Sequence, residues 1–279
     1  MSDENPNEGM DTPLADSFSE IRLEDLSPDL RTACERAGWP SLVPVQAKAI
    51  PYLLAGRDVM IQSRTGSGKT GAYLLPIMQK IDLQKNVAQA LVLVPTRELA
   101  LQVSQEALML TAGTQLRTAV VYGGVGYTAQ LDAFRSGAQL VVGTPGRILD
   151  HLLKNTLSLD HLKMLIFDEA DRMLSMGFYP DMVKIRRYIP TGRIASSMFS
   201  ATFPPQVIRL ASQFLHEPEL LSLSGNEVHI AESEHIYYVV PGMRKERSLV
   251  RIIEIENPAS AIIFCNTKDT VHYLSVVLK

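Results

Sequence analysis

Short apolar runs alternate with helix-like periodicity through most of the chain. The runs that predict strands are residues 58–62, 90–94, 118–122, 140–142, 164–167, 196–199 and 220–223. Between them, apolar residues recur every three or four positions, as at Leu99, Val103 and Ala107, which is typical of a helix with one buried face. Short, wholly apolar strands separated by helices predict an α/β fold, with a mostly parallel sheet covered by helices on both faces.

Two polar segments interrupt this pattern and divide the chain. Residues 1–17 are acidic and contain Pro and Gly, so we expect a disordered tail before the domain of residues 18–224. Residues 225–235 are polar and predict a linker. A second alternation follows in residues 236–279, with strands expected at 236–240 and 261–265 and helices from about 244 and 269. These 44 residues are too few to bury a core alone, so we interpret them as an incomplete second domain.

Charge and cysteine content narrow the class of protein. The net charge is −3, and residues 1–17 carry five acids without Lys or Arg, so the rest of the chain is near neutral. A nucleic-acid partner must therefore be recognised by local motifs, because there is no broad basic surface. The two cysteines, Cys34 and Cys265, are too far apart in sequence for a disulfide framework or a zinc cluster. The apolar runs are too short to span a bilayer and the N-terminus lacks a signal peptide, so we expect a cytoplasmic protein that binds no membrane.

The segment Ser-Arg-Thr-Gly-Ser-Gly-Lys-Thr at residues 63–70 follows a predicted strand and begins a helix. Its glycines let backbone N–H groups surround a polyphosphate, and the helix N-terminus favours an anion. Lys69 is suited to reach the β- and γ-phosphates, and the Thr70 hydroxyl to hold Mg²⁺. The alternative is an ordinary glycine-rich turn, since Ser63 stands where the general phosphate-loop pattern has Gly. The expected nucleotide-binding residues here are Thr65, Gly66, Ser67, Gly68, Lys69 and Thr70.

Three acids in Asp168-Glu169-Ala170-Asp171 directly follow the apolar run 164–167. The carboxyl ends of buried strands are where α/β sheets bind ligands. Asp168 would hold Mg²⁺, partly through water, and Glu169 would orient or deprotonate an attacking water. Alone, such a segment is usually an acidic helix N-terminus. The phosphate-binding motif upstream favours the catalytic interpretation.

Together these two motifs resemble those of the DEAD-box ATP-dependent RNA helicases of superfamily two. The resemblance extends from Phe18 to the end of the chain and implies a RecA-like P-loop NTPase domain followed by the start of a second RecA-like domain. It implies ATP and Mg²⁺ as cofactors and RNA, single-stranded or duplex, as a partner bound with little sequence preference. It also implies catalytic roles for Lys69, Asp168 and Glu169.

Residues 38–46, Gly-Trp-Pro-Ser-Leu-Val-Pro-Val-Gln, are similar to the adenine-recognising Q motif of that family, with Phe18 as its upstream aromatic. The Gln46 amide is suited to accept from and donate to the Hoogsteen edge of adenine, and Phe18 to stack on the ring. The family usually has Pro-Thr where this chain has Leu42 and Val43. Taken alone, Gln46 is better explained as an ordinary helix-start residue and Phe18 as a core aromatic.

Three further motifs match the family's single-stranded RNA surface, and each follows a predicted strand. Arginines and backbone N–H groups there would bind phosphates with little base reading. Taken singly, each motif is also explained as a helix cap or a turn. The resemblance assigns RNA binding to Pro95, Thr96, Arg97, Gly123, Gly124, Thr144, Pro145, Gly146 and Arg147.

Ser200-Ala201-Thr202 follows another predicted strand. In the family this motif couples hydrolysis to unwinding, and its hydroxyls are placed to bond to Asp171. We therefore expect Asp171, Ser200 and Thr202 to transmit the nucleotide state. The alternative is a serine/threonine turn before the following prolines.

Two motifs of the family's second domain, Ala-Arg-Gly-x-Asp and His-Arg-x-Gly-Arg-x-Gly-Arg, do not occur in these 279 residues. Their arginines act on the γ-phosphate, and such groups contribute orders of magnitude in rate. We therefore interpret the chain as a shortened gene product, a fragment of a longer protein or an engineered version. ATP-dependent remodelling of RNA duplexes then belongs to the full-length protein. The alternatives are a non-catalytic half-helicase that binds RNA and nucleotide, or an ATPase directed to DNA.

Overall fold

The computed structural model describes residues 18–64, 66–223, 234, 236–240 and 245–278. They form two compact units that divide between residues 228 and 229, and each is described by itself. The expected tail at 1–17 lies outside the described residues, as does the expected linker at 225–235 apart from residue 234.

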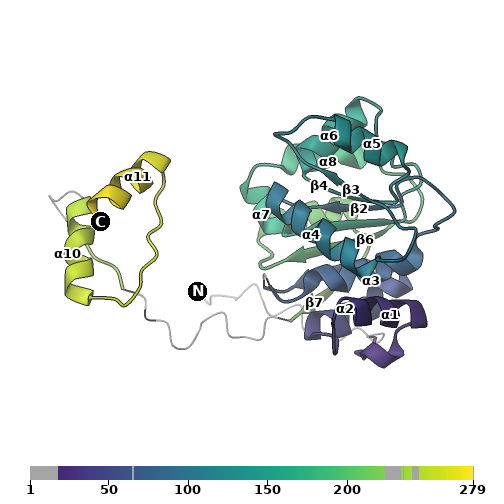
Figure 1. Cartoon of the computed structure of the whole chain (residues 1–279), viewed down its shortest axis with the longest axis horizontal. Helices are drawn as coiled ribbons and strands as arrows, with labels where there is room; N and C mark the ends of the chain where they lie inside the picture. The colour runs from purple at the N-terminus through teal and green to yellow at the C-terminus, as the bar shows by residue number, and fades with distance from the viewer. Residues whose placement is uncertain (1–17, 65, 224–233, 235, 241–244, 279) are drawn as a thin grey trace, which may run out of the picture. The chain divides into compact units, whose positions relative to one another are not determined.

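The first unit is built on a seven-stranded sheet in the order β3-β4-β2-β5-β6-β1-β7. Figure 1 shows this sheet with helices packed around it. Every pairing in it is parallel. The strands are β1 (Val59–Gln62), β2 (Ala90–Leu93), β3 (Thr118–Val121), β4 (Leu140–Gly143), β5 (Met164–Asp168), β6 (Ala195–Ser200) and β7 (Glu219–Ser222). The prediction of an α/β fold with a parallel sheet is confirmed.

Helices cover both faces of this sheet. They are α1 (Pro28–Arg36), α2 (Pro44–Ala55), α3 (Lys69–Lys80), α4 (Arg97–Leu110), α5 (Thr128–Arg135), α6 (Pro145–Leu153), α7 (Ala170–Ser175), α8 (Tyr179–Ile185) and α9 (Pro205–Phe214), with 3₁₀ turns at Leu23–Asp25 and Arg186–Tyr188. Successive strand side chains point to opposite faces, so Val92 packs in a core with α1–α4 while Leu93 packs in a second core with α5–α9. Burial on both faces explains why the strands are apolar throughout.

The parallel arrangement brings the predicted motifs to one edge. Each of β1 to β6 is followed at its carboxyl end by a segment singled out in the sequence. In a parallel sheet these ends lie at the same edge, which is where α/β folds place their ligands. The strand order puts β1, β5 and β6 side by side, so the segments after them are neighbours in space.

The second unit contains α10 (Lys245–Glu256) and α11 (Lys268–Val277). The Thr267 side chain caps α11 by accepting a hydrogen bond from Thr270 N at 3.2 Å. The predicted strands at 236–240 and 261–265 are wrong, because both segments are irregular. A strand needs a neighbouring strand to pair with, and the described part of this unit contains none. Among the described residues, no helix combines the length and apolar character needed to cross a membrane.

Candidate functional site

The loop between β1 and α3 owes its path to glycine. Gly66 and Gly68 have φ of 79° and 88°, a left-handed conformation that favours glycine. A Cβ on Gly68 would lie 2.6 Å from Val43 Cγ2, so space also excludes a side chain. Gly68 is the N-cap of α3 and Lys69 its first residue. Gly66 and Ser67 come directly before this N-cap. Thr65 lies outside the described residues.

Lys69 and Asp168 face each other at the ends of α3 and β5. Both are buried, and Lys69 Nζ lies 3.9 Å from Asp168 Oδ1 and 3.4 Å from the Ser63 carbonyl oxygen. The Tyr73 hydroxyl donates to Asp168 Oδ2 at 2.9 Å. Burial raises the pKa of Asp168, although the Lys69 ammonium and the Tyr73 hydroxyl oppose this.

The donor set around Asp168 fits Mg²⁺. Asp168 Oδ1 is buried yet accepts no hydrogen bond from the residues that the structure describes. A buried carboxylate oxygen left in this state is suited to a cation or to water bound to one. Thr70, the expected second ligand, is the residue after Lys69 in the same helix.

Two side chains that the sequence reasoning missed lie beside Thr70. They are Tyr73 of α3 and Glu106 of α4. Burial raises the pKa of both the Tyr73 hydroxyl and the Glu106 carboxyl, although the Thr70 hydroxyl lowers the pKa of each. Tyr73 lies one turn after Lys69 on the same helix face, a spacing from which its approach to Asp168 was predictable. Glu106 is brought in by tertiary packing and has no comparable local signal.

Glu169 occupies an unusual backbone conformation. It is the N-cap of α7 with φ 55° and ψ 53°, a left-handed conformation that is uncommon for a non-glycine residue. Its side chain is buried, and its Oε2 accepts from Arg172 Nη1 at 3.3 Å. A hollow of about 470 Å³ is lined by Glu169 together with Lys69, Asp171, Arg172 and Thr202. Lys69 of the phosphate loop, the acidic segment after β5 and Thr202 of the segment after β6 thus line one space.

Asp171, Ser200 and Thr202 are joined by hydrogen bonds. The Asp171 amide donates to Ser200 Oγ at 3.1 Å. The Asp171 carboxylate accepts from the Thr202 amide at 3.1 Å and from the Thr202 hydroxyl at 2.9 Å. The segment after β6 is therefore fixed to the first turn of α7.

Gln46 binds the phosphate loop directly. Its Oε1 accepts from the Val43 amide at 3.0 Å and its Nε2 donates to the Gly68 carbonyl at 3.1 Å. Both polar ends of this buried amide are thus engaged within the protein. Phe18 is 40% exposed and packs edge-to-face on Tyr52, with ring centroids 4.9 Å apart.

Most of the expected RNA-binding residues line a second hollow, of about 530 Å³. Those present are Arg97, Gly123, Thr144, Gly146 and Arg147, alongside Tyr122, Tyr127, Asp150 and Phe178. Gly124 is exposed in the same turn as Gly123. The two arginines both lie over tyrosine rings that the sequence reasoning missed, with Cζ to centroid distances of 5.2 Å for Arg97 on Tyr122 and 4.3 Å for Arg147 on Tyr127.

Three other expected RNA-binding residues do not line this hollow. Thr96 caps α4, because its hydroxyl accepts from the Leu99 amide at 3.2 Å. Pro145 is the first residue of α6, and both Pro95 and Pro145 are buried. These three residues shape the backbone next to the hollow and do not line it.

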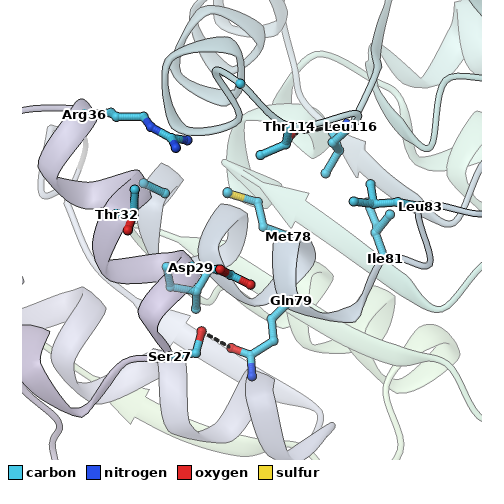
Figure 2. A pocket seen from close by; sticks show the side chains of 13 residues that line it. Ser27, Asp29, Thr32, Arg36, Met78, Gln79, Ile81, Leu83, Thr114 and Leu116 are labelled. Atoms are coloured by element: carbon cyan, nitrogen blue, oxygen red, sulfur yellow. Dashed lines mark hydrogen bonds between the residues drawn. The ribbon is translucent and has the colours of Figure 1, made fainter.

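A hollow of about 730 Å³ lies away from all of these residues (Figure 2). It is formed by α1, the C-terminal end of α3 and the segment after α4, which are elements at the amino edge of the sheet. Ser27 Oγ donates to Gln79 Oε1 at 3.4 Å across one end of it. None of the residues predicted from sequence lines this space.

Comparison with known proteins agrees with the sequence resemblance. The chain is 40% identical over 262 residues to the DEAD-box ATP-dependent RNA helicase CshA of Geobacillus kaustophilus, covering 94% of this chain and 55% of that protein. It is 43% identical over 233 residues to the ATP-dependent RNA helicase DeaD of Escherichia coli, covering 83% and 37%. The chain thus spans about half the length, or less, of the curated relatives it matches.

A solved structure and a family profile give the same assignment. The crystal structure of a DEAD box protein from Methanococcus jannaschii superposes with a TM-score of 0.68 at 33% identity, covering 91% of this chain and 68% of that one. The sequence profile of the DEAD/DEAH box helicases matches residues 43–210. The chain therefore belongs to the DEAD/DEAH box helicase family.

Proposed function

We propose that this chain provides the ATP-binding part of an ATP-dependent RNA helicase. The observation that carries the proposal is the convergence of Lys69, Glu169, Asp171 and Thr202 on one hollow at the carboxyl edge of a parallel sheet. In our proposal residues 18–224 form the RecA-like domain, 225–235 a linker and 236–279 the start of a second RecA-like domain. The free cysteines, one of them buried, support a cytoplasmic location.

The phosphate loop would bind the triphosphate. The N-terminus of α3 and the amides of Gly66 to Gly68 favour an anion, and Lys69 adds a positive charge. Thr70 and Asp168 would hold Mg²⁺, which when bound neutralises charge on the phosphate oxygens. Gln46 and Phe18 would recognise adenine. In this proposal the Gln46 amide exchanges its present partners for the base edge, or shares them with it.

Glu169 would act on the attacking water. Its carboxylate lies in the hollow beside Lys69, within the same lining. In hydrolysis the water oxygen bonds to the γ-phosphorus, the bond to the β,γ-bridging oxygen breaks and ADP leaves. Glu169 orients the water and accepts its proton. When the nucleotide is hydrolysed, Asp171 would transmit the resulting shift of the site to Ser200 and Thr202 through the hydrogen bonds described above.

RNA would bind along the second hollow. Arg97 and Arg147 are placed to contact phosphates, and the backbone of Gly123, Gly124 and Thr144 to Gly146 to fit the strand closely. Contacts of this kind act on the backbone and give little base specificity. The activity we propose is the remodelling of RNA duplexes with ATP hydrolysis.

The second candidate is a binding module without turnover. The specific observation in its favour is that the two arginine-bearing motifs of the family's second domain do not occur in these 279 residues. Such a chain would occupy nucleotide and RNA without completing the reaction.

The test is steady-state ATP hydrolysis with and without single-stranded RNA, paired with direct binding of a fluorescent ATP analogue. Lys69→Ala removes the buried ammonium and is expected to weaken nucleotide binding at least about tenfold. Glu169→Gln is expected to keep binding and lower turnover by about 10²- to 10⁴-fold. Exposed Lys184→Ala and Glu35→Gln are matched controls that should change neither.

Each outcome decides between the candidates. RNA-stimulated hydrolysis that depends on Lys69 and Glu169 supports the helicase proposal. Binding that depends on Lys69, with no hydrolysis in any condition, supports the binding module. No nucleotide binding by the wild-type chain refutes both.

A further inference from the structure

Tyr127 stands between two parts of the proposed RNA surface. It is the N-cap of α5 and directly follows the glycine-rich turn at residues 123–126. Its side chain contacts Arg147, Asp150 and Lys154, which lie on one face of α6 and just beyond its end. Residues spaced by three and four positions share a helix face, so all three approach the same ring.

These three residues contact both the ring and the hydroxyl of Tyr127. The Arg147 guanidinium lies 4.3 Å from the ring centroid and the Lys154 ammonium 4.0 Å from it. The hydroxyl donates to the Asp150 carboxylate and accepts from Lys154 Nζ at 2.6 Å. These hydrogen bonds lower the pKa of Asp150 and raise the pKa of Lys154, so both side chains remain charged at neutral pH.

Arg147 is held from two sides. Its Nη2 donates to the Val125 carbonyl in the glycine-rich turn at 2.6 Å. Its Nη1 is covered by protein and makes no hydrogen bond within the described part of the chain. The guanidinium is therefore fixed between a tyrosine ring and a carbonyl, and it fastens the turn after β3 to α6.

We propose that Tyr127 is a positioning residue that docks the glycine-rich turn on α6 and aligns Arg147 for an RNA phosphate. The inference rests on the proposed RNA-binding function and deepens it. Tyr127 acts through Arg147 and the turn, so it need not touch RNA itself. The aromatic ring carries the effect, since the ring stacks on the guanidinium while the hydroxyl serves the Asp150 and Lys154 pair.

The test compares matched variants by fluorescence anisotropy with a labelled oligouridylate of about ten nucleotides, in the presence of Mg²⁺ and a non-hydrolysable ATP analogue. Tyr127→Leu removes the ring, and we expect Kd for the oligonucleotide to rise about fivefold. Tyr127→Phe keeps the ring and should restore Kd to within about twofold of wild type. Arg147→Ala should weaken binding at least as much as Tyr127→Leu.

Tyr188→Leu is the control for the loss of a half-buried tyrosine, since Tyr188 lies in the 3₁₀ turn after α8 and does not line the hollow. It should leave Kd unchanged, and all variants should bind the ATP analogue as wild type does. If Arg147→Ala weakens binding but Tyr127→Leu does not, the positioning role is refuted and the RNA surface stands. The same refutation follows if Tyr127→Phe is as weak as Tyr127→Leu, or if Tyr188→Leu matches them. If wild type fails to bind, or Arg147→Ala binds normally, the RNA surface itself is refuted and this inference with it.

Discussion

Replacing Tyr73 with Phe removes a single hydroxyl from the centre of the proposed ATP site. That hydroxyl is fully buried and donates to Asp168 Oδ2 at 2.9 Å. The ring itself packs edge-to-face on Phe199, with centroids 5.3 Å apart, and the variant retains that contact. The substitution therefore tests one hydrogen bond with little change of shape.

The expected loss of stability follows from what remains around Asp168. Within the described part of the chain its Oδ1 has no hydrogen-bond partner, and Lys69 Nζ is 3.9 Å away, beyond hydrogen-bond distance. A hydrogen bond to a charged group contributes about 1.5–3 kcal/mol, so we expect the free energy of unfolding to fall by about 2 kcal/mol. For a unit of this size that lowers Tm by roughly 4–8 °C.

The loss of unfolding free energy in Tyr73→Phe should become smaller in acid. Burial raises the native pKa of Asp168 above its unfolded value, and the Tyr73 hydroxyl opposes the rise. Because the native carboxyl binds a proton more tightly than the unfolded one, its unfavourable contribution is absent in acid and grows as pH rises through the native pKa. Tyr73→Phe raises that pKa further. The difference from wild type is therefore largest above the native pKa and shrinks as pH falls through it.

Urea unfolding followed by circular dichroism at neutral pH and at about pH 5 measures both effects. Tyr188→Phe is the matched control, because Tyr188 is half-buried and its hydroxyl makes no hydrogen bond among the described residues. A loss below about 0.5 kcal/mol would refute the proposed strength of the bond. A loss of the expected size that grows in acid would refute the assignment of its partner as an ionised carboxylate.

Two further predictions concern the packing of α2 against the phosphate loop. Gly71→Ala places a Cβ 2.3 Å from Trp39 Cη2 and 2.6 Å from Gln46 Nε2, so we expect overpacking to destabilise the fold by about 2 kcal/mol. An unchanged Tm would contradict this close approach. Gln46→Ala removes the bond to the Gly68 carbonyl and the proposed adenine contact, so ATP should lose its advantage over GTP in competition binding. Equal losses for both nucleotides would show that Gln46 supports the loop but does not read the base.

The strands of the first unit were predictable because each is buried on both faces. Ala90–Leu93 is an example: every side chain is covered, so an apolar run of four residues is unambiguous there. The helix 97–110 follows from its three- and four-residue spacing in the same way. The sheet order was not predictable, since it depends on which strand ends meet in space.

The predicted strands at 236–240 and 261–265 show the limit of that reasoning. Their composition matches a buried strand, yet Ile262 and Phe264 are 83% and 92% exposed. An apolar segment forms a strand only where neighbouring strands are present to pair with it, and its own sequence does not show whether they are.

Site residues divide along the same line. The motif segments at the strand ends could be located from local spacing, whereas Glu106 and Tyr127 reach their partners through contacts between separate elements. Tyr127 is 20 residues from Arg147, and Glu106 is 36 residues from Thr70. Nothing in a local pattern marks such pairs before the fold brings them together.

Ser200 links the phosphate loop to the first turn of α7 by two hydrogen bonds. Its carbonyl accepts from the Ser63 amide at 3.0 Å at the start of the phosphate loop. Its hydroxyl accepts from the Asp171 amide, two residues beyond Glu169. The segment leading to Thr202 is thus bonded on one side to the loop that would hold phosphate and on the other to α7, the helix that directly follows Glu169, our proposed general base. A shift of either element cannot occur without straining or breaking a bond to Ser200, so this segment is suited to report the state of the nucleotide.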